Sequence, residues 1–160
     1  MQYRHDCKKL YGIGNDLKGY KNFLNLIEKY DINIIMDIRY KRPRHPSAYN
    51  YKKIIRDLNN LGVHYIYYKP FVIPQAINLK LAQAINYYNI FDQIKQMIKE
   101  EKDAVNEIII KIQNGDNICF MGRHVYHGIC YRTPTMEAIQ EMNNEKHIRE
   151  KDQVQLIHLK

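Results

Sequence analysis

A chain of 160 residues with 45% hydrophobic content suits one compact core, so we expect residues 1–160 to form a single domain. The formal net charge of +8 at pH 7 favours anionic partners, such as nucleic acid or a phosphorylated small molecule. No stretch reaches the roughly 20 apolar residues of a membrane span, and residues 1–9 are polar where a secretory signal would be apolar, so we expect a cytoplasmic protein without membrane contact.

Apolar periodicity predicts alternating strands and helices along the chain. The first strand contains Gly12 and ends at Gly14, and a helix follows it, for which Asn15 or Asp16 is the expected cap. Gly62 is expected to end a later helix. The expected strands are residues 9–14, 32–38, 63–68, 118–121 and 154–159, and the later helices are residues 51–61, 79–88, 90–113 and 133–142.

Strands separated by helices require crossover connections, which predicts an α/β fold with a Rossmann-like, mostly parallel sheet flanked by helices. Ligands of such sheets bind outside the carboxyl ends of the strands, because loops converge there and helix amino termini point their N–H groups inward. The candidate site therefore combines residues 12–16, 37–46, 69–74 and 122–135.

Asp37 stands at the end of the second predicted strand, and Arg39 follows two residues later. A carboxylate in this place is able to receive a proton or to pair with the arginine, and both uses need the same geometry. Asp37 is therefore a catalytic candidate. The alternative is that it only caps loop N–H groups or anchors Arg39 through an ion pair.

The loop of residues 39–46 carries four permanent cations together with two prolines and one tyrosine. Arg39, Arg42 and Arg44 are candidates for two-point contacts with phosphate, because guanidinium groups match its geometry. Tyr40 is placed to stack on a nucleobase. The alternative is a solvated basic loop on the surface.

Cys130 and Arg132 come just before the last predicted helix, with Pro134 in its first turn. A positive helix end and a neighbouring arginine activate a thiol, so Cys130 is a candidate nucleophile. Met136 stands where the phosphatase-type arginine would be, so that spacing is absent. The alternative is a packed thiol, with Arg132 as an anion ligand.

Neither a metal nor another cofactor is expected. The three cysteines are an odd number without close spacing, which argues against a disulfide framework and a four-ligand zinc site. His124, His127 and Cys130 form only a short mixed cluster. Leu17 stands where a dinucleotide-binding fingerprint has its third glycine, which favours a simple turn at Gly14.

Several short motifs along the chain form an ordered set, at residues 11–15, 35–39, 42–46, 115–121 and 130–132. Their order and spacing resemble the bacterial, archaeal and phage proteins grouped as domain of unknown function 488. The resemblance covers nearly the whole chain, and Tyr49 resembles the aromatic after the family's arginine-rich loop. Met121, Arg123 and Tyr131 depart from the family pattern, which usually has cysteine, glutamate and histidine there. The resemblance implies a Rossmann-like fold with a shared pocket, in a family whose chemistry is not generally established.

Three functional hypotheses follow from these residues. The first is an enzyme that acts on nucleic acid or a nucleotide, such as a DNA glycosylase-like enzyme or another hydrolase. In it Asp37 orients water or stabilises an oxocarbenium-like centre, while a flipped base stacks on Tyr40 or Tyr131. The second is a non-catalytic binding module for the same ligands. The third is a cysteine-dependent transferase that uses Cys130.

These hypotheses share one set of candidate residues. The catalytic candidates are Asp37 and Cys130. The expected phosphate or nucleic-acid contacts are Gly14, Asn15, Arg39, Tyr40, Arg42, Arg44, Tyr49, Arg123 and Arg132.

Overall fold

The computed structural model describes residues 7–14, 19–40, 50–83, 86–124 and 126–160. The site candidates Asn15, Arg42, Arg44 and Tyr49 lie outside these ranges. The strands are β1 (Lys8–Gly14), β2 (Ile34–Asp37), β3 (His64–Tyr67), β4 (Ile118–Gly122) and β5 (Val154–His158). The α-helices are α1 (Tyr20–Lys29), α2 (Tyr51–Asn60), α3 (Gln75–Gln83), α4 (Tyr88–Glu100), α5 (Lys102–Gln113) and α6 (Arg132–Lys146). Short 3-10 turns are η1 (Lys69–Phe71), η2 (His127–Ile129) and η3 (Glu150–Asp152).

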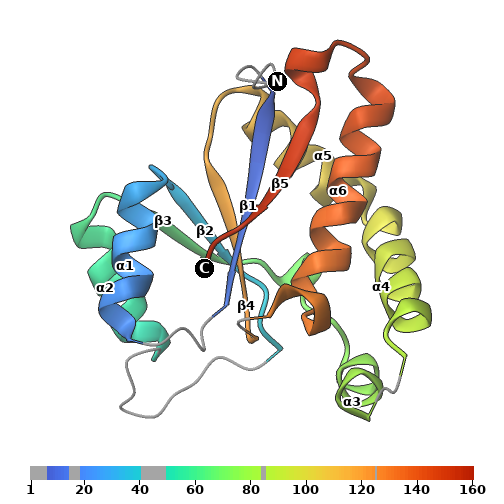
Figure 1. Cartoon of the computed structure of the whole chain (residues 1–160), viewed down its shortest axis with the longest axis horizontal. Coiled ribbons are helices and arrows are strands. Elements are labelled where there is room, and N and C mark those ends of the chain that lie inside the picture. The colour runs from blue at the N-terminus through green and yellow to red at the C-terminus, as the bar shows by residue number, and fades with distance from the viewer. Residues whose placement is uncertain (1–6, 15–18, 41–49, 84–85, 125) are drawn as a thin grey trace.

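The strands form one five-stranded sheet in the order β3-β2-β4-β1-β5 (Figure 1). Every pairing between neighbouring strands is parallel. This confirms the predicted α/β, Rossmann-like fold. The carboxyl ends of all strands therefore point toward the same edge of the sheet.

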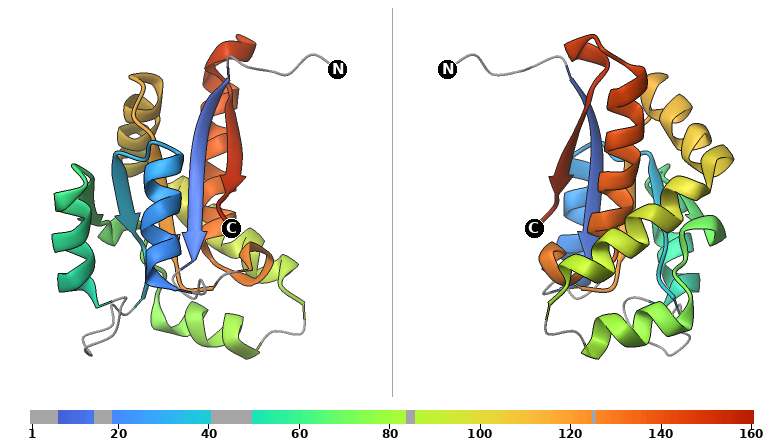
Figure 2. Two further views of the ribbon diagram at one scale, coloured as in Figure 1. Left: turned by 60° about the vertical axis from the view of Figure 1, so that its left-hand side comes forward. Right: turned by 90° about the vertical axis from the view of Figure 1, so that its right-hand side faces the viewer.

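Helices cover both faces of the sheet, α1 and α2 on one and α4, α5 and α6 on the other (Figure 2). The central strands β1, β2 and β4 are largely buried, which is why their sequences read as nearly continuous apolar runs, whereas the edge strands β3 and β5 are only partly buried. Alternate strand residues separate into two cores. Ile13 and Ile35 pack with α1 and α2, whereas Leu10 and Met36 pack with the three helices opposite.

The prediction of one continuous helix over residues 90–113 is wrong, because two helices, α4 and α5, cover this range. Glu101, between them, has ψ 58°, outside the helical region. The break gives the two halves separate partners, since α4 packs along α6 while α5 also reaches β1. The helix predicted at 79–88 is also displaced, because α3 covers Gln75–Gln83.

Helix α1 begins later than predicted. Its N-cap is Gly19, with φ 86°, so the expected cap at Asn15 or Asp16 is wrong. The end of α2 is as predicted, because Gly62 has φ 74° after the last turn. None of the helices within the described ranges combines the length and apolarity that a membrane crossing needs.

Candidate functional site

The carboxyl edge of the sheet contains a topological switch point between β1 and β4. The chain leaves β1 through α1 on one face and leaves β4 through α6 on the other. These neighbouring strands end side by side, with Gly14 paired to Gly122. Connections that diverge in this way open a crevice at the carboxyl edge, which is where parallel α/β sheets bind ligands.

Asp37 and Arg39 form a buried ion pair at this edge. The Arg39 Nε donates to Asp37 Oδ1 at 2.9 Å, and its Nη2 donates to Oδ2 at 2.8 Å. The Arg39 backbone N–H also donates to Oδ1, at 3.1 Å. The two side chains are 0% and 2% exposed. Of the alternatives left open by the sequence, both the ion pair with Arg39 and the hydrogen bond to a loop N–H group are present in the structure, and a catalytic role for Asp37 stays a prediction.

Tyrosines on the edge strand β3 complete this cluster. The Tyr65 hydroxyl donates to Asp37 Oδ2 at 2.5 Å, and the Tyr67 hydroxyl donates to the Arg39 carbonyl at 3.2 Å. Burial alone would lower the pKa of Arg39, but the hydrogen bonds and charge of Asp37 outweigh it and raise that pKa. Arg39 is therefore a fixed cation at neutral pH.

Tyr131, directly before α6, is buried and interacts electrostatically with Asp37 and Arg39. Burial raises the pKa of its hydroxyl, the nearby Cys130 and Asp37 raise it further, and Arg39 acts in the opposite direction. The phenol therefore keeps its proton at neutral pH. A carboxylate, a guanidinium and a protonated phenol thus interact electrostatically at this edge, and all three are almost completely buried.

Cys130 and Arg132 are both fully buried. The thiol packs against Gly122, where an added Cβ would lie 2.5 Å from the Cys130 Sγ. Arg132 Nη1 donates to the His124 carbonyl and so holds the segment after β4. Because Arg132 is 0% exposed, its guanidinium does not contact solvent anions in this structure. Roles for Cys130 as a nucleophile and for Arg132 as an anion ligand stay predictions.

A stacked histidine pair lies next to this segment. The rings of His127 and His158 are parallel within 8°, with their centroids 3.9 Å apart. Burial, together with His127 and Arg132, lowers the pKa of His158 to about 4. Burial also lowers the pKa of His127. Both rings are therefore neutral at neutral pH.

Sequence reasoning missed the two tyrosines and the histidine pair. The spacing of Tyr65 and Tyr67 carried a signal, because residues two apart on a strand face the same side. The contact between His127 and His158 had no such signal, since the residues are far apart in the chain. No group of three or more metal-ligating side chains occurs in the part of the chain described here.

Arg123 is exposed, unlike Arg39 and Arg132. It follows β4 directly and lines a pocket of about 300 Å³ beside α3. Figures 1 and 2 place α3 below the carboxyl ends of the strands. Tyr40, which follows Arg39 at the end of β2, is half-buried. The carboxyl edge thus offers an accessible cation and an open volume next to the buried cluster.

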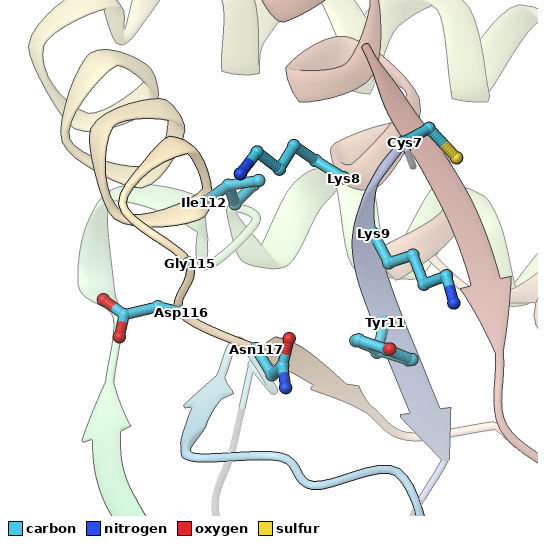
Figure 3. A pocket seen from close by; sticks show the side chains of 8 residues that line it. All are labelled: Cys7, Lys8, Lys9, Tyr11, Ile112, Gly115, Asp116 and Asn117. Carbon is cyan, nitrogen blue, oxygen red and sulfur yellow. The ribbon is translucent and has the colours of Figure 1, made fainter. Parts of the chain in front are cut away.

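A second pocket, of about 290 Å³, lies at the amino end of the sheet (Figure 3). There Asn33 donates to Asp116 at 2.9 Å, and the backbone N–H of Asn117 donates to Asn33 at 2.7 Å. These bonds fasten the turn before β4 to the start of β2. Lys9 in this pocket is exposed and lies at the opposite end of the sheet from Arg123.

No family model, curated protein or solved structure matches this chain. The fold and the site define a Rossmann-like α/β protein with a polar cluster at its carboxyl edge. The resemblance to domain of unknown function 488 stays a prediction from the motifs.

Proposed function

We propose that this protein binds a nucleotide or a nucleic acid through phosphate at the carboxyl edge of its sheet. The observation that carries the proposal is the switch point itself, where the glycine ends of β1 and β4 lie side by side. The exposed Arg123 follows one of these ends directly. The net charge of +8 adds a long-range attraction for phosphate.

A hydrolase that acts on the same ligand is the second candidate. It is favoured by the protonated Tyr131 that interacts electrostatically with Asp37, by analogy with glycoside hydrolysis, which uses an acid together with a carboxylate. However, both oxygens of Asp37 already accept hydrogen bonds from Arg39 or Tyr65. Binding therefore has the stronger support. The buried thiol of Cys130 gives a cysteine-dependent transferase no comparable support.

The proposal is tested by measuring the affinity for a single-stranded oligonucleotide over a range of salt concentrations. Arg123→Gln is the test variant, and Lys9→Gln is its charge-matched control at the other end of the sheet. If Arg123 contacts phosphate, its loss reduces the slope of log K against log salt by about 0.7. The control is expected to change the slope much less.

Equal effects of the two variants would contradict a phosphate site at the carboxyl edge, and so would failure of the protein to bind any nucleotide or oligonucleotide. The hydrolase candidate has its own test. It is contradicted if a folded Asp37→Asn protein turns over a substrate of the wild-type protein at an unchanged rate.

A further inference from the structure

The pocket beside α3 has a size and a lining that suit one particular part of a nucleotide. Its volume is about 300 Å³, at the lower end of the range for small-molecule sites. Leu81 of α3 is buried and Ile129 of η2 is half-buried, so part of the wall is apolar. The exposed Ala82 adds only a methyl group. This space admits a single planar ring system but not a duplex.

Tyr87 gives this pocket an aromatic surface. It is half-buried, and its ring packs against Phe91 with a centroid distance of 6.1 Å and an interplanar angle of 49°. A tyrosine held in this way is a stacking platform that loses little freedom when a base binds. Stacking of this kind is tolerant of base identity, because every base has a π-face.

Polar groups complete the lining. Asn78 of α3 is half-buried in the pocket wall, and its amide supplies both donors and an acceptor to the edge of a base. Arg123 brings a permanent cation to the same pocket. The His124 backbone beside it is fixed by the hydrogen bond from the buried Arg132. An aromatic ring, an amide and a cation therefore converge on a volume of about 300 Å³.

We propose that this pocket accepts the base of one nucleotide, stacked on Tyr87 and contacted by Asn78, with its phosphate near Arg123. The inference rests on the function proposed above and names the unit that is recognised. That unit is a base together with its phosphate. A free nucleotide and an unstacked residue of a single strand both present it.

The test is a calorimetric titration of the full chain with nucleoside 5′-monophosphates, ribose 5-phosphate and a short single-stranded oligonucleotide. The nucleoside monophosphates are expected to bind at least about fivefold more tightly than ribose 5-phosphate, because only they contain a base. Comparison with the oligonucleotide shows whether the natural ligand is a free nucleotide or a single strand. Tighter binding of the oligonucleotide identifies a strand, and tighter binding of the monophosphate identifies a free nucleotide.

Variants separate the role of the ring from a general effect on folding. Tyr87→Ala is expected to weaken monophosphate binding by about 5- to 150-fold and to leave ribose 5-phosphate binding unchanged. Tyr87→Phe keeps the stacking surface and should bind nearly as well as the wild type. Tyr88→Ala is the matched control, because Tyr88 is 80% exposed and does not line the pocket.

Two outcomes overturn the inference and are distinguishable from each other. If ribose 5-phosphate binds as tightly as the nucleoside monophosphates, or if Tyr87→Ala and Tyr88→Ala behave alike, the base pocket is refuted while phosphate binding stands. If no phosphate-bearing ligand binds at all, both this inference and the proposed function fail.

Discussion

Replacement of Asp37 by asparagine removes the counter-charge of a guanidinium that is only 2% exposed. Asparagine keeps the shape of the side chain, so the change acts mainly on charge. Arg39 then stays buried without its partner, a situation that costs about 3–5 kcal/mol of unfolding free energy. That is a large part of the roughly 5–15 kcal/mol that stabilises a typical domain. At about 2–4 °C per kcal/mol, the melting temperature should fall by roughly 6–20 °C.

Urea unfolding followed by far-UV circular dichroism measures this loss. The double variant Asp37→Asn, Arg39→Met removes the buried charge as well, so it is expected to recover a substantial part of the stability. A loss below about 1 kcal/mol in the single variant would refute the buried ion pair, because so small a value is typical of exposed pairs. The ion pair would also be refuted if the losses of unfolding free energy in the two single variants simply added up in the double variant.

Two further predictions concern buried titratable groups. The pKa of His158 falls from the ordinary 6.5 to about 4 in the folded state, so the unfolded state takes up a proton more readily. Its contribution to stability is complete above about pH 6.5 and is lost as the pH falls toward 4. The unfolding free energy should fall by roughly 1–2 kcal/mol over this range, after allowance for solvent screening. In His158→Gln this part of the pH dependence of the urea midpoint should be absent. An identical pH dependence in wild type and variant would contradict it. Cys7 is half-buried, whereas the other two cysteines are fully buried. One thiol should therefore react quickly with a disulfide reagent and the other two only on unfolding, and rapid modification of Cys130 in the folded protein would contradict the packing against Gly122.

The sequence was sufficient to predict a mostly parallel sheet with flanking helices. Buried strands have nearly continuous apolar runs, whereas amphipathic helices have apolar residues on one face with a helical period. It did not reveal the break at Glu101. Ile98 and Val105 are seven residues apart, close to two helical turns, so the apolar pattern continues in phase across the break. The late start of α1 depends on the positive φ of Gly19, which the apolar pattern does not encode.

The sequence predicted where the site lies but not how Asp37 and Arg39 interact there. A strand end followed by an arginine placed Asp37 and Arg39 at the carboxyl edge, yet the choice between ion pair and exposed base depends on burial. The hydrogen bond from Tyr65 depends on the register of β2 and β3, in which Asp37 lies opposite Tyr67. Pairing between strands that are distant in sequence sets these contacts, and the spacing of the two tyrosines indicates only that they share a face, not which residue they contact.

In the proposed function, a phosphate-bearing ligand binds at the carboxyl edge of the sheet. The most direct measurement is a map of backbone amide chemical shifts during titration with a nucleoside 5′-monophosphate. We expect the changes to concentrate at Gly14, Gly122, Arg123 and Tyr87. Changes concentrated at the amino edge, around Lys9, or no change at saturating ligand, would contradict it.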